Sequence, residues 1–144
     1  MKVKDVMTQG VECARPRDSI AHAAERMRGL DVGSLPVCGD EDKLVGMITD
    51  RDITIRATAG ACDAKATPVG DVMTLGIVFC FEDQNVEDAA RLMEDNQIRR
   101  LAVLNRDKRL VGIVSLGDLA VKTGDDHLSG EALERVSEPA LPVR

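Results

Sequence analysis

The chain is an internal duplication, because residues 3–56 recur 66 positions later without a gap. Asp5-Val6-Met7-Thr8 returns as Asp71-Val72-Met73-Thr74, and Leu44-Val45-Gly46 returns as Leu110-Val111-Gly112. Each copy is therefore one structural unit. A unit of about 55–60 residues buries only about 60% of the surface that its unfolded chain exposes, so one copy alone would be marginally stable. We expect the two copies to share a core about a pseudo-twofold axis, forming one two-lobed domain with two related clefts.

The repeat sets the expected boundaries. Repeat 1 spans residues 1–58 and repeat 2 spans residues 71–124. Residues 59–70 between them are mostly small and end at Pro68 and Gly70, which is typical of a linker. Residues 125–144 form a C-terminal tail, in which we expect a turn of helix from Gly130 to Val136, before Pro139 and Pro142 end regular structure.

Each repeat has the pattern of a β-α-β-β-α unit. The first helix of each copy has apolar residues at helical spacing and a polar N-cap, Ser19 in repeat 1 and Asn85 in repeat 2. Short apolar runs around polar turns predict strands, and the last of them, being continuously apolar, predicts burial on both faces. The predicted fold class is α+β, with the two repeats packed sheet to sheet. The expected strands are 11–13, 35–38, 44–49, 77–81, 101–104 and 110–115, and the last helices are 50–58 and 116–123.

Composition excludes several classes of partner. The net charge of −6 and the absence of a long Lys/Arg run predict no nucleic-acid binding. No apolar run is long enough for a membrane span and the N-terminus lacks an export signal, so we expect a cytoplasmic protein with no membrane partner. The four cysteines lack metal-binding spacing, and we interpret them as reduced apolar packing residues, with no metal site. His127 follows two acids in what we expect to be a solvated loop.

The end of each repeat carries the candidate functional residues. A strand glycine is followed by a hydroxyl and, three residues later, by an acid: Thr49 with Asp52, and Ser115 with Asp118. A hydroxyl and an acid at this spacing before a helix also form a capping box, which is the alternative interpretation. However, a carboxylate suits the two donor hydroxyls of a ribose, and a helix start favours phosphate. A glycine inside a strand indicates close approach of a backbone or a ligand.

With these motifs, residues 3–123 resemble the paired cystathionine-β-synthase (CBS) domains, also called a Bateman module. The resemblance rests on two copies of Asp-Val-Met-Thr, on a helix with Ala-Ala and Met, and on the closing Gly-x-x-(Thr/Ser)-x-x-Asp. It implies regulatory binding of AMP, ADP, ATP or S-adenosylmethionine in clefts between the two copies. It also implies a homodimer. No cofactor is required by this interpretation.

The resemblance implies two crossed sites, in which one copy holds the base and the other the ribose and phosphate. In such modules, basic residues lie near the phosphates of the ligand. The resemblance places Arg100 at such a position, with Arg51 or Arg56 as further candidates. Repeat 1 has Ser34 in place of Arg100. The first site would consist of Thr8, Cys13, Val32, Gly33, Ile113, Ser115 and Asp118. The second would consist of Met47, Thr49, Asp52, Thr74, Phe79, Ile98 and Arg99.

The sequence therefore predicts a regulatory module that senses an adenosine-containing ligand and signals to another, unidentified protein. The alternative is a ligand-free dimerisation or interaction module. An enzyme is not expected, because no nucleophile, acid–base or metal constellation is apparent and the chain has only two histidines.

Overall fold

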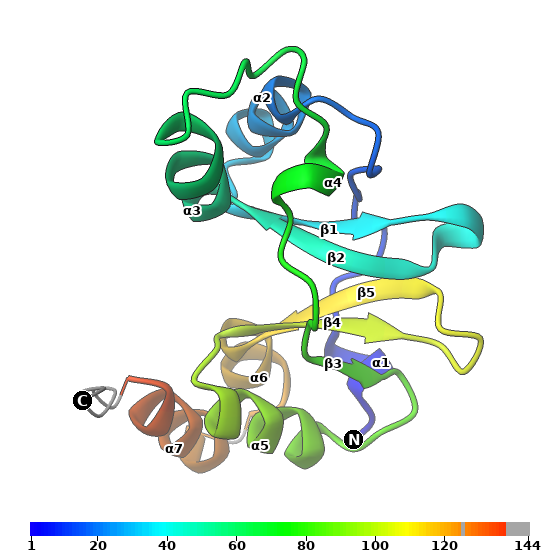
Figure 1. Ribbon diagram of the computed structural model, residues 1–144. Helices are drawn as coiled ribbons and strands as arrows, with labels where there is room; N and C mark the ends of the chain where they lie inside the picture. The colour runs from blue at the N-terminus through cyan, green and yellow to red at the C-terminus, as the bar shows by residue number, and fades with distance from the viewer. Residues whose placement is uncertain (125, 138–144) are drawn as a thin grey trace. The chain divides into compact units, whose positions relative to one another are not determined.

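A computed structural model describes residues 1–124 and 126–137 of the chain (Figure 1). The chain forms two compact units that do not coincide with the two sequence repeats. The repeat-1 unit contains Glu12–Ile77 and Lys108–Leu110. The repeat-2 unit contains Met1–Val11, Val78–Asp107 and the described residues from Val111 onward. The first eleven residues thus belong to the unit built mainly from the second repeat.

The repeat-1 unit is a two-stranded antiparallel sheet with its helices on one face (Figure 1). Its buried core joins both strands to the helix that begins at Ile20 and to Val69 and Val72 of a short helix near the end of the unit. The elements are α2 (Ile20–Leu30), β1 (Ser34–Cys38), the 3-10 turn η1 (Asp40–Asp42), β2 (Leu44–Thr49), α3 (Asp50–Asp52), the π-helix η2 (Ile53–Thr58) and α4 (Val69–Val72).

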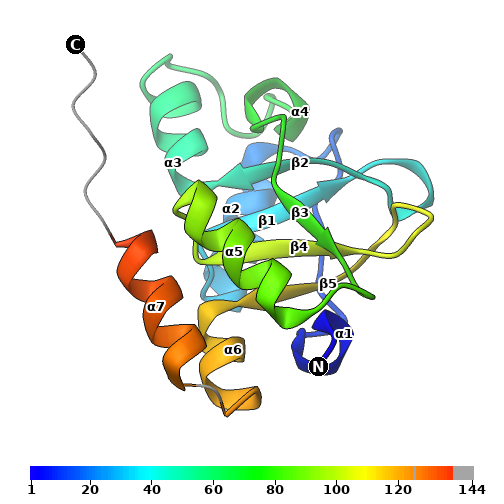
Figure 2. The same cartoon turned by 90° about the horizontal axis from the view of Figure 1, so that it is seen from below.

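The repeat-2 unit has a three-stranded sheet in the order β3-β4-β5, with β3 parallel to β4. Figure 2 shows α7 beside α5 and α6, and Ala132 of α7 is fully buried in the same core as Val3 and Val6. The elements are α1 (Val3–Val6), β3 (Phe79–Phe81), α5 (Val86–Asn96), β4 (Arg100–Leu104), β5 (Leu110–Ser115), α6 (Leu116–Lys122) and α7 (Asp126–Val136).

Local signals account for the two longest helices within the repeats. The Ser19 hydroxyl accepts a hydrogen bond from the His22 backbone N–H at 3.1 Å, as expected of an N-cap. At the start of α5 the Asp88 carboxylate accepts one from the Asn85 N–H at 3.3 Å. Both helices end in a residue with left-handed backbone, Asp31 and Gln97. The predicted α+β class, with strands and helices alternating in two repeats, is confirmed, whereas the boundaries at residues 58, 70 and 124 stay predictions.

Three details of the predicted pattern were wrong. The first strand of repeat 1 is absent, since residues 11–13 carry no strand and Ala14 makes only an isolated bridge to Val37. The last strands are not buried on both faces: in β2, Ile48 is buried but Val45 is 38% exposed, because the helices of the unit cover one face only. The C-terminal helix begins at Asp126 and so includes the backbone of His127, for which we predicted a loop. Pro139 and Pro142 lie outside the described residues.

Candidate functional site

The Asp52 carboxylate lies at the start of α3 in the repeat-1 unit, and the residue is only 7% exposed. One of its oxygens accepts a hydrogen bond from the Thr49 N–H at 3.1 Å, and the Thr49 hydroxyl accepts one from the Asp52 N–H at 2.9 Å. The Thr74 hydroxyl donates to both carboxylate oxygens, at 3.0 and 3.1 Å. Asp52 is therefore a capping residue that is also held by a segment 22 residues further along the chain.

Asp118 occupies the equivalent place at the start of α6 in the repeat-2 unit. Its carboxylate accepts from the Ser115 N–H at 2.9 Å, and the Ser115 hydroxyl accepts from the Asp118 N–H at 3.1 Å. Lys122 forms an ion pair with the other carboxylate oxygen at 3.2 Å. The described contacts of Thr8, the counterpart of Thr74, include no hydrogen bond to Asp118, whose side chain is 15% exposed. Asp118 thus keeps more acceptor capacity than Asp52.

One helical turn after each acid, a basic residue pairs with the carboxylate and also donates to a carbonyl of a distant backbone segment. Lys122 also donates to the Val6 carbonyl at 2.9 Å. Arg56 lies 3.8 Å from the Asp52 carboxylate and donates to the carbonyls of Val72 and Met73 at 3.3 and 3.1 Å. Sequence reasoning missed Lys122, and it considered Arg56 only as a phosphate ligand. The available signal was that these two residues are 66 positions apart and both basic.

The strand glycines are explained by close approach of backbone. A Cβ on Gly112 would lie 2.7 Å from the Thr8 carbonyl oxygen, and a Cβ on Gly46 would lie 3.0 Å from the Thr74 carbonyl oxygen. Both segments also exchange backbone hydrogen bonds with the next strand residue: Thr8 with Ile113 at 2.8 and 3.1 Å, and Thr74 with Met47 at 2.7 and 3.0 Å. The glycines therefore admit the Met-Thr segment, one of the two possibilities that the sequence left open.

The structure places the remaining predicted site residues by unit. In the repeat-1 unit the Gly33 carbonyl accepts from the Asp50 N–H at 2.9 Å, so residues 32–33 lie against the start of α3. In the repeat-2 unit the Arg99 carbonyl accepts from the Leu116 N–H at 3.0 Å, so residues 98–99 lie against the start of α6. The repeat-1 unit contains Cys13, Val32, Gly33, Met47, Thr49, Asp52 and Thr74. The repeat-2 unit contains Thr8, Phe79, Ile98, Arg99, Arg100, Ile113, Ser115 and Asp118.

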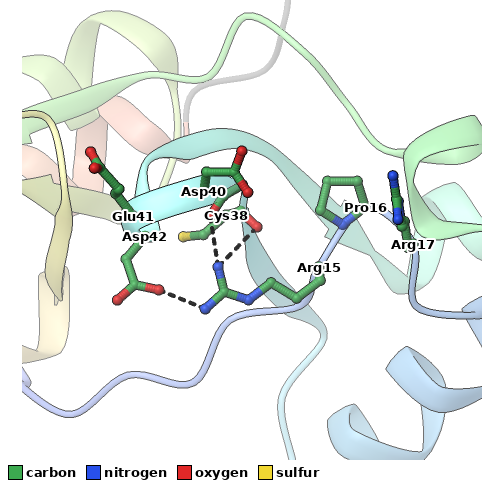
Figure 3. Close-up of a pocket in the computed structure, with 8 residues that line it drawn as sticks. Arg15, Pro16, Arg17, Cys38, Asp40, Glu41 and Asp42 are labelled. Atoms are coloured by element: carbon green, nitrogen blue, oxygen red, sulfur yellow. Dashed lines mark hydrogen bonds and ion pairs between the residues drawn. The ribbon is translucent and has the colours of Figure 1, made fainter.

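A separate pocket in the repeat-1 unit is lined by none of the predicted site residues (Figure 3). Arg15 crosses it and donates to the carbonyls of Cys38 and Gly39 at 3.3 and 2.7 Å and to the Asp42 carboxylate at 2.6 Å. The carboxylate bond raises the pKa of Arg15. Because its guanidinium already donates to the turn between β1 and β2, we interpret Arg15 as a structural residue that stabilises this turn.

The four cysteines are all free thiols. Burial raises the pKa of the Cys38 thiol to about 12, with a smaller contribution from the neighbouring Cys13, and burial likewise raises the pKa of Cys80 to about 12. These two buried thiols pack as small apolar groups, whereas Cys62 is exposed. Within residues 1–124 and 126–137, no three His, Cys, Asp or Glu side chains gather closely enough to hold a metal ion.

None of the helices in the described part of the chain combines the length and the apolar character needed to cross a bilayer.

Comparison with known proteins identifies the repeats. The CBS domain model matches residues 3–57 and 69–122. The CBS domain-containing protein YhcV of Bacillus subtilis is 43% identical over 135 residues, which are 94% of each chain. By contrast, inosine-5'-monophosphate dehydrogenase of Methanocaldococcus jannaschii matches 82% of this chain over only 23% of its own length. The match to that enzyme is therefore confined to a minor part of it.

Similar structures carry ligands of two kinds. Hypoxic Response Protein I, solved with two coordinated zinc ions, is 35% identical over 85% of this chain and 98% of its own, with a TM-score of 0.77. CBSX2, from Arabidopsis thaliana, was solved in complex with AMP and is 31% identical over 83% and 93%, with a TM-score of 0.70. The CBS pair of MJ0100, solved with 5'-methylthioadenosine and S-adenosylmethionine, is 29% identical over 86% and 96%, with a TM-score of 0.72.

The CBS match covers both repeats, and YhcV is matched over nearly its whole length. The chain is therefore a CBS pair rather than an enzyme, as the sequence predicted. It belongs to the family of tandem CBS domain proteins, the Bateman modules.

Proposed function

We propose that this CBS pair binds adenosine-containing nucleotides and signals their presence to another protein. The AMP complex of CBSX2 and the S-adenosylmethionine complex of MJ0100 support the ligand class. The observation that carries the proposal is the Asp118 carboxylate, which is held in place at a helix start and yet retains acceptor capacity. The sequence predicts that this acid binds the ribose hydroxyls.

The hydrogen bonds of Asp118 favour this role. One oxygen accepts from the Ser115 N–H and the other faces the Lys122 ammonium, so lone pairs on both oxygens remain for two donor hydroxyls. The backbone contact fixes the orientation of the carboxylate before a ligand arrives, which lowers the entropy cost of binding. Asp52 already accepts a hydroxyl hydrogen from Thr74 on both oxygens. We therefore assign the tighter nucleotide site to Asp118 and the weaker one to Asp52.

Calorimetric titration with AMP, ATP and CMP tests the proposal directly. AMP and ATP should bind and CMP should not. Asp118→Ala should weaken the tighter event at least tenfold, since a hydrogen bond to a charged group contributes about 1.5–3 kcal/mol.

Asp88→Ala provides a matched control. Asp88 occupies the same capping position at the start of α5, where its carboxylate accepts from the Asn85 N–H, but it is not a predicted site residue. Both substitutions should cost a similar, small amount of folding stability, about 0.3–1 kcal/mol. Only Asp118→Ala should change nucleotide affinity. Equal affinities in the two variants would refute the role of Asp118, and no heat with any adenosine nucleotide would favour the ligand-free interaction module.

We also propose that the protein acts as a homodimer. Ile55 of η2 and Val121 of α6 are equivalent positions of the two repeats, and they are 55% and 82% exposed in the single chain. Two large exposed apolar side chains at matching places suit an interface between copies. A CBS relative, the CBS-CP12 protein of bloom-forming cyanobacteria, was solved as a hexamer.

A further inference from the structure

The only two aromatic residues of the chain lie on the same side of the short edge strand β3. The rings of Phe79 and Phe81 meet edge to face, with centroids 5.6 Å apart and an interplanar angle of 87°. Cys80 between them points into the core and is 1% exposed, whereas Phe79 is 37% exposed. Edge-to-face contact at this distance is a favourable geometry for aromatic rings.

Phe81 is fixed in turn by a charged pair. The Arg106 guanidinium lies 4.1 Å from the centre of the Phe81 ring, a distance typical of a cation–π contact. The same guanidinium donates to both oxygens of Asp83, from Nε at 2.9 Å and from Nη2 at 2.8 Å. This paired hydrogen bond lowers the pKa of Asp83 and raises that of Arg106. Because a forked contact fixes the plane of the guanidinium, the charged pair restricts the Phe81 ring beneath it.

This arrangement exists in one repeat only. The position equivalent to Phe79 in repeat 1 is Cys13, and the position equivalent to Phe81 is Arg15, which binds the turn after β1. A surface role for Arg106 and Asp83 alone would explain the ion pair between two turns. It would not explain a second, partly exposed aromatic ring held against the first.

We infer that Phe79 is a stacking platform for the adenine base and that Phe81, Arg106 and Asp83 are the residues that position its ring. The inference rests on the proposed function, since Phe79 is one of the predicted nucleotide-binding residues. Stacking on an aromatic side chain is available to any base, and a purine offers the larger face. The platform therefore favours purine over pyrimidine, and it makes the Phe79 site different in kind from the Cys13 site.

Fluorine NMR of protein labelled with 4-fluorophenylalanine reports directly on the surroundings of each ring. The chain should give two resonances, one for each phenylalanine. Phe81→Leu assigns them. AMP should shift the Phe79 resonance more than the Phe81 resonance, and ribose 5-phosphate, which has no base, should not shift it. Without any nucleotide, Arg106→Gln should shift both resonances, since Phe79 is positioned through Phe81. Arg91→Gln, the same change on an exposed arginine of α5, should shift neither.

Affinities supply the second measurement. Phe79→Leu should weaken AMP binding at the site that contains Phe79 by about two- to tenfold, the amount expected for loss of an aromatic contact. Arg106→Gln should weaken it less, and only when Phe79 is present, so the double variant should equal Phe79→Leu alone. Arg106→Lys, which keeps the charge but loses the fork, should not restore the affinity.

The outcomes separate this inference from the proposed function. If calorimetry shows AMP binding but neither fluorine resonance moves on adding it, the platform is wrong and the proposed function stands. If Arg106→Gln leaves the Phe79 resonance unchanged without nucleotide, the positioning role is wrong. If AMP gives no heat at all, both the platform and the proposed function are wrong.

Discussion

At Gly46 of β2 and Gly112 of β5, a backbone segment that passes close to the strand limits the size of the side chain. Alanine at Gly112 would bring its Cβ to 2.7 Å from the Thr8 carbonyl oxygen, and alanine at Gly46 would meet Thr74 in the same way. Backbone cannot yield as a flexible side chain does, so we expect each substitution to cost about 1–3 kcal/mol of unfolding free energy.

Gly29→Ala is the control for these two substitutions. Gly29 lies inside α2 and no atom would contact an added Cβ. Alanine there should raise the unfolding free energy by about 0.5–1 kcal/mol, since glycine is a poor helix former. Urea unfolding of the three variants provides the comparison, and equal midpoints for Gly29→Ala and Gly112→Ala would contradict the close approach.

The buried thiols predict how stability changes in alkali. Burial raises the pKa of Cys80 to about 12 from its ordinary value of 9.0. Between these values the unfolded chain loses the proton and the folded chain keeps it, so deprotonation favours unfolding. The contribution of the protonated Cys80 thiol to folding stability is complete below pH 9.0 and is lost as the pH rises toward 12. Urea midpoints should therefore fall from about pH 8 to about pH 10. Cys80→Ala should reduce the fall, whereas Cys62→Ala, at an exposed thiol, should not.

At the scale of elements, Lys122 of α6 links the end of α1 to the Asp118 carboxylate. Its ammonium donates to the Val6 carbonyl at 2.9 Å, so it neutralises the negative end of this short helix. We expect Lys122→Met to speed amide hydrogen exchange in residues 3–8 a few-fold, corresponding to about 0.3–1 kcal/mol. Lys122→Arg, which introduces the residue found at the equivalent position 56, should restore slow exchange. Unchanged exchange in Lys122→Met would show that the contact does not hold the segment.

The elements also show which parts of the fold were predictable from the sequence. Helix α2 and strands β1 and β2 follow from local periodicity and from the Ser19 cap, which act over a few neighbouring residues. The missing first strand of repeat 1 was not predictable, because an extended run becomes a strand only if a partner pairs with it along its length. The π-helix η2 carries no local signature that distinguishes it from the predicted α-helix.

In the candidate site, too, the contacts between neighbouring residues could be inferred from the sequence and the contacts between distant residues could not. The capping boxes at Asp52 and Asp118 match the alternative interpretation of the two motifs, which the sequence could supply because both partners of each box lie within four residues. The bond from Thr74 to Asp52 and the Phe81–Arg106 contact join residues more than twenty positions apart. Such contacts depend on the completed fold, and the sequence pattern alone does not specify them.

At the scale of the whole molecule, we expect a dimer that depends on the two equivalent apolar positions. Light scattering at micromolar concentration should give at least twice the chain mass of 15.5 kDa. Ile55→Glu and Val121→Glu should each shift the mass toward the monomer, because a charge buried in an interface is costly. Leu133→Glu, at an exposed apolar residue of α7, should leave the mass unchanged. A mass near that of one chain for the unmodified protein would contradict the dimer.

The exchange of N-terminal segments between units determines where this chain can be shortened. Val3 and Val6, which precede repeat 1's own strands, belong to the core of the repeat-2 unit. Val69 and Val72, which open repeat 2, belong to the core of the repeat-1 unit. Deletion of either repeat at its sequence boundary would therefore leave the surviving repeat with core residues that lack their neighbours. Each unit therefore depends for part of its core on a segment that the sequence assigns to the other repeat.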